Sequence, residues 1–318
     1  MDWTSGAPLA ALIAARAIHF GATALLAGAL LFRAAIAGPP AAASPAASVL
    51  VDRQARWVAG GALVVSLASG ILWFAVTAAE MGGMPFGEAI KPDVLQMILV
   101  ATQFGSVASV RFALAITTAV LLALDRLRPL RWLALVAALA FAASIAWTGH
   151  SGSGYGVSGN TQLTADVLHL LAASAWIGGL VPLALLLAFA RSRSGPWLAT
   201  ATAVTRRFSV LGIVSVATLI ASGATNAWFL VGSFKALTTT EYGRVLMLKL
   251  VLFVVMLAIA AINRNVLTPQ LATSSADGRV AALQKLVRHC VYEIVLGLAI
   301  VSVAAWLGTL HPASHFMN

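Results

Sequence analysis

Residues 148–179 read TGHSGSGYGVSGNTQLTADVLHLLAASAWIGG, and this stretch indicates how the whole chain is built. A short polar, glycine-rich connection joins two long apolar segments. His150, Asp166, His169 and Trp176 lie where one hydrophobic helix ends and the next begins. In a chain that is 60% hydrophobic and 9% charged, two histidines and a carboxylate at one membrane surface mark a candidate site.

The composition around this stretch is that of a membrane protein. Mean hydropathy is +0.94, and 9% of the residues are charged. An ordinary soluble domain has about 25% charged residues. The apolar runs are about 20 residues or longer, enough to cross a hydrocarbon core about 30 Å thick as helices. The predicted fold class is all-α, a polytopic membrane helical bundle in which residues 1–318 form a single transmembrane domain.

Eight membrane spans are predicted. They are expected at about 9–35, 57–79, 104–124, 131–149, 164–189, 207–232, 242–263 and 288–309. The loops after spans one, three, five and seven hold fourteen of the 20 lysines and arginines. Because cytoplasmic loops are enriched in Lys and Arg, both termini are predicted to face the periplasm (N-out/C-out).

The remaining composition excludes other classes. The net charge of +10 follows from these basic loops, so no nucleic-acid partner is expected. The single cysteine, Cys290, excludes an internal disulfide framework and a CxxC metal motif. The loops at 38–47 and 268–279 are expected to be plain flexible connections. The outer loop at 80–103 contains an apolar stretch, 94–101, that is too short to span and is expected to be a surface or re-entrant helix.

Matching residues recur in the two halves of the chain. RAIHF at 16–20 and DVLHL at 166–170 each place a histidine nine residues before a glycine. LASG at 67–70 corresponds to IASG at 220–223. These matches predict two parallel four-helix repeats, 9–150 and 164–311, related by an axis along the membrane normal. His19 and His169 would then be equivalent residues facing each other near that axis.

His19 and His169 are the main candidate ligands. Ionisable groups inside spans usually face the bundle interior or a polar cavity. Neutral imidazole is a common metal ligand and suits copper. The alternative is a histidine that is simply hydrogen-bonded within the bundle. Asp166 lies on the same helical face as His169, either to orient the imidazole or to act as an acid at a helix N-terminus.

Other candidates lie on the same outer side. Met81 and Met84 offer thioether sulfur, which selects Cu⁺ over hard cations. His311 and His315 form a weaker candidate pair near the C-terminus. Trp176 either lines the site or packs one helix on another.

Three basic residues oppose a simple cation site. Arg16, Arg111 and Lys249 are expected in the outer half of the membrane, where they would repel Cu⁺ unless paired. They could instead hold an anionic ligand, such as the propionates of a haem with His19 and His169 as axial ligands. A haem-binding redox protein is therefore the alternative function.

The stretch at 148–180, together with RRFSVLG at 206–212 and YGRVLMLKL at 242–250, resembles the copper resistance protein D family. The resemblance covers nearly the whole chain. It implies an inner-membrane protein of copper homeostasis that moves copper across the membrane. It also implies a periplasmic copper-binding partner of the CopC type, which would be a separate chain because no such β-sandwich domain is present here.

We therefore expect copper transport or homeostasis rather than an enzyme, with no catalytic residue. Copper, as Cu⁺ or Cu²⁺, would arrive from the periplasm at Met81, Met84 and His150 and pass to His169 and His19. The outer ligand set without an energy-coupling motif favours uptake or delivery over active efflux. A third hypothesis is a purely structural partner of another membrane complex.

Overall fold

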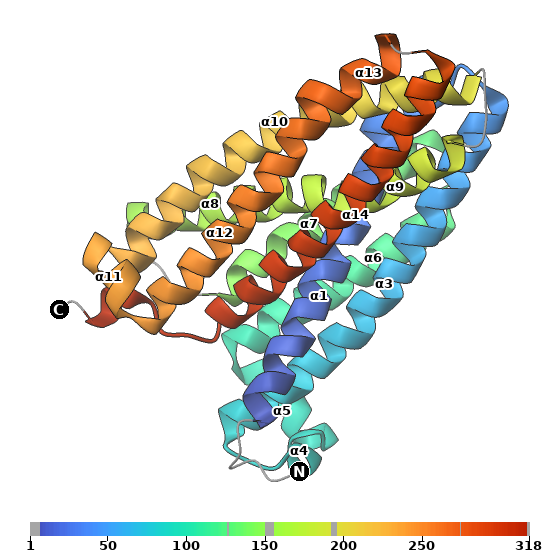
Figure 1. Ribbon diagram of the computed structural model, residues 1–318. Coiled ribbons are helices and arrows are strands. Elements are labelled where there is room, and N and C mark those ends of the chain that lie inside the picture. Colours follow the sequence, from blue (N-terminus) through green and yellow to red (C-terminus); the bar gives the residue numbers. More distant parts are fainter. Residues whose placement is uncertain (1–6, 126, 150–155, 192–195, 274, 317–318) are drawn as a thin grey trace.

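The computed structural model describes residues 7–125, 127–149, 156–191, 196–273 and 275–316. Eight helices in this part of the chain are long and apolar enough to cross a membrane, which confirms the predicted fold class. None of the described residues forms a β-strand. Figure 1 shows α4, α5 and α11 toward one end of the bundle and α13 toward the other.

Several spans consist of more than one helical segment. The first four are α1 (Ala7–Leu31) with η1 (Phe32–Ala37) and α2 (Gly38–Ala41), then α3 (Pro45–Gly82), α6 (Gln103–Ala123), and α7 (Arg128–Ala143) with η2 (Ser144–Thr148). The last four are α8 (Gly156–Ala173) with η4 (Ser174–Gly178) and α9 (Gly179–Ala190), then α10 (Pro196–Val231), α12 (Glu241–Ile262) with η5 (Asn263–Leu267) and α13 (Thr268–Thr273), and α14 (Ala276–Leu307). The remaining elements are α4 (Phe86–Ala89), α5 (Pro92–Ala101), α11 (Phe234–Thr239) and η6 (Ala313–Phe316).

The helices extend further than hydropathy indicated. The predictions of flexible loops at 38–47 and 268–279 are wrong, because α2, the start of α3, α13 and the start of α14 occupy most of them. Alanine-rich sequence favours helix beyond the lipid boundary. Ser44 caps α3 by accepting from the Ala47 amide, with Pro45 in the first turn. The predicted short helix in the outer loop is confirmed as α5.

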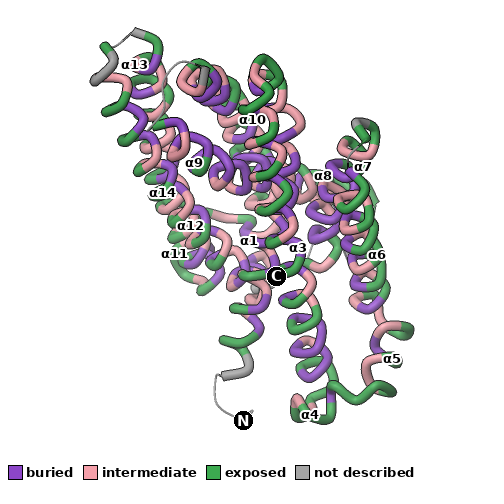
Figure 2. Tube along the Cα trace, turned by 90° about the vertical axis from the view of Figure 1, so that its right-hand side faces the viewer, coloured by how far each residue is buried: buried purple, intermediate pink, exposed green. Residues whose placement is uncertain are grey.

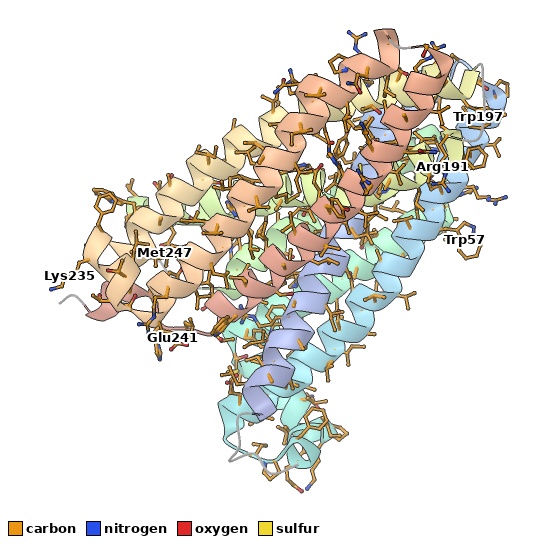
Figure 3. All side chains as sticks on the ribbon, in the orientation of Figure 1. Trp57, Arg191, Trp197, Lys235, Glu241 and Met247 are labelled. Atoms are coloured by element: carbon orange, nitrogen blue, oxygen red, sulfur yellow. The ribbon has the colours of Figure 1, made fainter. Side chains whose placement is uncertain are left out.

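The ends of the bundle differ in composition. Figure 3 shows Trp57, Arg191 and Trp197 near one end and Lys235 and Glu241 near the other. Trp57 is 77% exposed, as expected for an aromatic side chain at a membrane–water interface. Figure 2 shows the buried residues on the inward faces of the helices and the exposed ones outside.

The packing centre of the bundle is α1, which contacts α3, α7, α9, α14 and η4. One apolar cluster, which includes Leu26, Leu63 and Phe141, lies among α1, α3, α6 and α7. A second cluster, which includes Trp176 and Leu283, joins α9, α10 and α14 to η1 and α3. The N-terminal and C-terminal halves therefore each bury apolar side chains, and α1 and η4 join them.

The two halves meet at a backbone contact between glycines. A Cβ atom on Gly28 would collide with the Gly178 backbone and the Ser174 carbonyl. A Cβ on Gly178 would collide with the Ala24 carbonyl and approach the Gly28 Cα. The contact is reciprocal, since each glycine meets the partner glycine and the carbonyl group four residues before that partner. Only glycine permits this close an approach of two helices.

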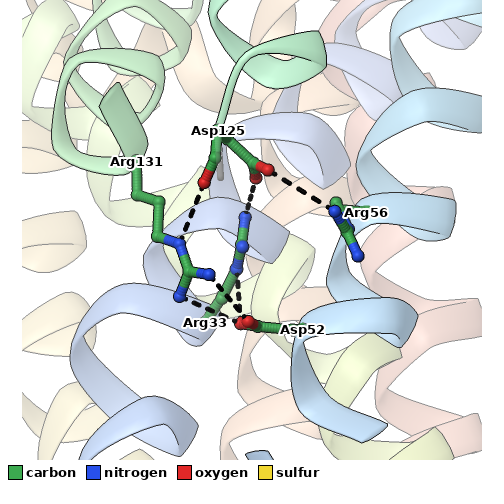
Figure 4. Close-up of polar contacts among 5 residues, drawn as sticks. All are labelled: Arg33, Asp52, Arg56, Asp125 and Arg131. Carbon is green, nitrogen blue, oxygen red and sulfur yellow. Dashed lines mark hydrogen bonds and ion pairs between the residues drawn. The ribbon is translucent and has the colours of Figure 1, made fainter. Parts of the chain in front are cut away.

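An ion-pair network joins three spans at the end opposite α4 and α5 (Figure 4). Arg33 is 5% exposed and pairs with Asp125 and, at 2.9 Å, with Asp52. Arg131 pairs with Asp52 at 2.9 Å and donates to the Asp125 carbonyl at 3.0 Å, and Arg56 lies 3.7 Å from Asp125. In the sequence these arginines stand out only as topology signals. The network therefore links η1, α3, α7 and the α6–α7 connection at this end of the N-terminal half.

Candidate functional site

His19 is held in the N-terminal half by contacts on both ring nitrogens. Its Nδ1 lies 2.9 Å from the Ser66 carbonyl oxygen and 3.4 Å from Ser69 Oγ, both on α3. A Cβ on Gly70 would lie 3.0 Å from the imidazole, so the glycine makes room for the ring. Since the carbonyl can only accept, Nδ1 carries the proton and Nε2 is the acceptor. His19 is 3% exposed.

The acceptor nitrogen of His19 is occupied by Arg111 from α6. The Arg111 guanidinium lies 2.5 Å from His19 Nε2 and also donates to the Phe141 carbonyl at 3.1 Å and to Ser144 Oγ at 2.7 Å. The same guanidinium lies over the Phe141 ring, 4.8 Å from its centroid. Arg111 thus pairs with neutral groups, among them a backbone carbonyl.

A cavity of about 30 Å³ adjoins this pair. Its lining includes His19, Trp73, Arg111 and Thr148. The Trp73 ring lies 5.4 Å from the His19 ring, so an aromatic wall faces the imidazole. The space suits a water molecule or a single small ion, and a metal ion could reach His19 Nε2 only if Arg111 moved away.

His169 occupies a similar setting in the C-terminal half. Its Nδ1 lies 3.0 Å from Ser222 Oγ on α10, and a Cβ on Gly223 would lie 3.6 Å from the ring. Its ring is also within hydrogen-bonding reach of the Leu219 backbone, and Lys249 on α12 acts on it electrostatically. Ser69 and Gly70 of the LASG segment therefore contact His19. Ser222 and Gly223 of the IASG segment contact His169.

The matched contacts continue elsewhere. Thr102 caps α6 by accepting from the Gly105 amide at 2.9 Å, and Thr240 caps α12 by accepting from the Gly243 amide at 3.0 Å. Each threonine hydroxyl also donates to a carbonyl four residues earlier. A cation lies beside each histidine, Arg111 in one half and Lys249 in the other. The sequence predicts Arg111 and Lys249 as ligand-positioning residues, and the structure places one of them beside each histidine.

The acidic candidate, Asp166, interacts electrostatically with Lys249 and Tyr242. Asn226 Nδ2 donates to its Oδ1 at 3.2 Å, and its charge acts on both Lys249 and Tyr242. At the matched place in α1 stands Arg16, whose guanidinium lies 5.4 Å from the Trp73 ring and within electrostatic range of Glu80. The two histidine sites therefore differ in charge.

The remaining candidates are dispersed. Met81 is exposed at the end of α3, and His311 is exposed after α14. Met84 packs against an apolar cluster formed by α3, α4, α5 and α6. His150 and the side chain of His315 lie outside the described residues. Within the described part of the chain, no three His, Cys, Asp or Glu residues group closely enough to hold a metal ion.

His19 and His169 do not form one joint site in the structure. His19 contacts α3 and α6, whereas His169 contacts α10 and lies beside α12. A haem with both as axial ligands requires the two imidazoles on opposite sides of one iron. The arrangement therefore favours two separate histidine sites over a shared haem site.

Comparisons with known proteins agree over most of the chain. The family model "Copper resistance protein D-like, N-terminal domain" matches residues 5–160, and "Copper resistance protein D" matches residues 202–307. Copper resistance protein D of Pseudomonas syringae pv. tomato is 31% identical over 224 residues, 68% of this chain and 71% of that protein. Inner membrane protein YebZ of Escherichia coli (strain K12) is 31% identical over 300 residues, 94% and 98% of the two chains.

A third relative is longer. Copper transport protein CutJ of Bacillus subtilis (strain 168) is 33% identical over 225 residues, which cover 67% of this chain and 40% of that protein. No solved structure matches significantly.

Proposed function

Because this chain belongs to the copper resistance protein D family, we propose that it carries copper across the inner membrane and so serves copper homeostasis. The eight apolar helices and the similarity to an inner membrane protein support this location. The names of two relatives, a copper resistance protein and a copper transport protein, support the cargo.

The observation that carries the proposal is a pair of histidine sites inside the spans, with His19 buried and His169 half-buried. Each half holds one imidazole inside the spans, with Nδ1 against a serine–glycine pair and a cation beside the ring. Imidazoles with a fixed tautomer inside the spans are suitable ligands for copper. A transport site must release its ion. A histidine nitrogen to which a neighbouring cationic side chain can return is suited to release, because that side chain would displace the metal ion.

We assign different roles to the two histidines. His169 Nδ1 faces a serine hydroxyl, so its Nε2 is the ligand atom. His19 Nε2 becomes available only when Arg111 withdraws, which makes Arg111 a positioning residue for that step. Copper would arrive from the periplasm by way of Met81, Met84 and His150, and transport would run toward uptake.

The topology and the repeat belong to the same proposal. The basic loops support periplasmic termini. The reciprocal Gly28–Gly178 contact and the paired threonine caps support two parallel repeats, 9–150 and 164–311, within one transmembrane domain. The copper donor would be a separate periplasmic protein of the CopC type. No catalytic residue is part of the proposal.

Replacing His169 or His19 with alanine should abolish copper-dependent accumulation in cells. The His169→Ala change removes the proposed ligand atom, and His19→Ala removes the second ligand and frees Arg111. Cellular copper, measured by elemental analysis in a strain lacking the native gene, should fall to the level of an empty vector.

Matched controls stand next to each histidine. Ile18 is 52% exposed and Leu168 is 47% exposed, so both face away from the bundle. Ile18→Ala and Leu168→Ala should leave copper accumulation unchanged. Unchanged copper in both histidine variants would refute the route. Metal analysis with an absorption spectrum of the purified protein tests the haem alternative, which a Soret band would favour.

A further inference from the structure

A large cavity in the C-terminal half is not used by the proposed histidine route. It measures about 440 Å³ and is lined by residues of α10 and α12, together with residues of α9 and α14. Since α10 packs mainly against α8, and α12 mainly against α14, the two helices leave a space between them. A volume in this range is typical of binding sites for organic ligands.

The cavity opens sideways, toward the surroundings of the bundle. Ile213, Ala217 and Ile220 on α10 line it and are exposed, and so is Ala261 on α12. On a membrane span, exposed apolar side chains suit the hydrocarbon of the bilayer. The opening between α10 and α12 therefore faces lipid.

The lining changes from polar to apolar along the cavity. Ser209, Asn265 and Thr268 lie toward the end that the basic loops assign to the cytoplasm, whereas Ile220 and Leu257 lie further out along α10 and α12. From Ser209 to Ile220 the helix rises about 16 Å at 1.5 Å per residue. One leaflet of the hydrocarbon core is about 15 Å deep. The cavity thus has the length and the polarity of a lipid of the inner leaflet.

Arg264 supplies a cation at the polar end of the cavity. It is exposed and donates from Nη1 to Ser209, at 2.7 Å to Oγ and 3.3 Å to the carbonyl. Neither bond uses Nε or Nη2, so this edge of the guanidinium can donate two parallel hydrogen bonds to a phosphate. Basic pockets between membrane helices on the cytoplasmic side bind anionic lipid headgroups.

Among the described residues that line the cavity, Glu293 on α14 is the one acid. It is 3% exposed. Asn263 Nδ2 donates to its Oε1 at 2.6 Å, and the Trp176 indole also donates to the carboxylate. Glu293 is therefore held by neutral donors in the wall of the cavity, whereas Arg264 lies at the opening. An anionic headgroup entering from the membrane surface would meet the arginine.

We propose that this cavity binds an anionic phospholipid of the inner leaflet, with one acyl chain between α10 and α12 and the phosphate at Arg264. The chain fills the space that the two helices leave, and its apolar walls exclude water from the polar groups beneath. The inference does not depend on the cargo or on the histidine route.

The test uses the full-length protein purified in detergent, with phosphatidylglycerol or phosphatidylcholine of the same acyl chains added and bound lipid measured by native mass spectrometry. We expect the wild type to bind phosphatidylglycerol about tenfold more tightly than the zwitterionic lipid, as one hydrogen-bonded charge pair would give. Arg264→Gln should remove this preference, because glutamine keeps a donor but carries no charge.

A second variant fills the cavity itself. A Cβ on Gly212, which lines the cavity, has no neighbour within 4 Å. Gly212→Phe should therefore be accommodated in the open space and abolish the binding of both lipids. The two variants address the headgroup and the acyl chain separately.

Matched controls lie elsewhere in the chain. Gly61 on α3 also has no neighbour within 4 Å of a Cβ, and Arg244 is exposed at the opposite end of α12. Gly61→Phe and Arg244→Gln should bind both lipids as the wild type does, and so should the His19→Ala/His169→Ala double variant. Equal affinity of the wild type for the two lipids, or undiminished binding by Gly212→Phe, would overturn the inference. A cavity that holds only detergent would give both of these results.

Discussion

Gly178→Ala should destabilise the protein by about 1–3 kcal/mol, the usual cost of overpacking a close-packed interior. The new methyl group would meet the Ala24 carbonyl and the Gly28 backbone, neither of which can rotate away as a side chain could. Gly28→Ala should behave alike, because its methyl group would meet the Ser174 carbonyl and the Gly178 backbone. Thermal unfolding in detergent, followed by tryptophan fluorescence, measures the loss.

The matched control is Gly61→Ala in α3. Gly61 is exposed, and a Cβ there has no neighbour within 4 Å. Alanine is better than glycine in a helix by about 1 kcal/mol, so this change should leave the protein equally or more stable. Opposite signs at Gly61 and Gly178 would show that contact, not helix propensity, decides the outcome. A neutral Gly178→Ala would contradict the close crossing.

Asp125→Ala should have the other large effect on stability. Removing one partner of a buried ion pair typically costs about 3–5 kcal/mol, because the remaining charge stays buried. Asp125 is 1% exposed and accepts from Arg33, which is 5% exposed. Asp52 would retain part of the compensation, since it also contacts Arg33. The same fluorescence measurement in detergent gives the loss.

A double variant separates charge from packing. Arg33→Met/Asp125→Leu replaces the pair with apolar groups and should be more stable than Asp125→Ala alone, since no unpaired charge remains. Lys91→Ala serves as the control, because Lys91 pairs with Glu88 on the surface and such pairs contribute about 0–1 kcal/mol. A double variant that loses as much as the single one would refute this account.

Hydropathy and charge were sufficient to predict the spans and their order. Each of the eight predicted spans has a helix in the structure. Their ends were not predicted, because hydropathy reports which residues suit lipid and not where a helix stops. The start of α3 at Pro45 depends on the Ser44 cap and on the proline, which are local backbone features.

The site was predicted in part. Spacing identified His19 and His169, but not that Arg111 occupies His19 Nε2, since such a contact depends on how two distant spans pack. In a regular α-helix Trp176, seven residues after His169, would lie on nearly the same face as that histidine. The π-helical turn η4, which contains Trp176, changes the angular register of the helix, and Trp176 donates to Glu293.

The acids Asp52 and Asp125 went unnoticed for a similar reason. In the sequence each lies among arginines beside a predicted span, where the positive-inside rule counts only the cations. Their role follows from the convergence of η1, α3 and the α6–α7 connection at one point. A linear reading of charge contains no signal for such a convergence.

The contact between Gly28 and Gly178 is also the point about which the two halves would turn in any relative movement. Backbone contact at Gly28 and Gly178 leaves no room for α1 and the fifth span to approach more closely, so a change in their crossing angle would turn about this point. Each histidine lies nine residues from the pivot, a lever arm of about 13 Å at 1.5 Å per residue. A tilt of about 10° would then swing each imidazole by roughly 2 Å. Because Arg111 and Ser222 lie in the same halves as the histidines they contact, such a tilt would move each candidate site as one unit.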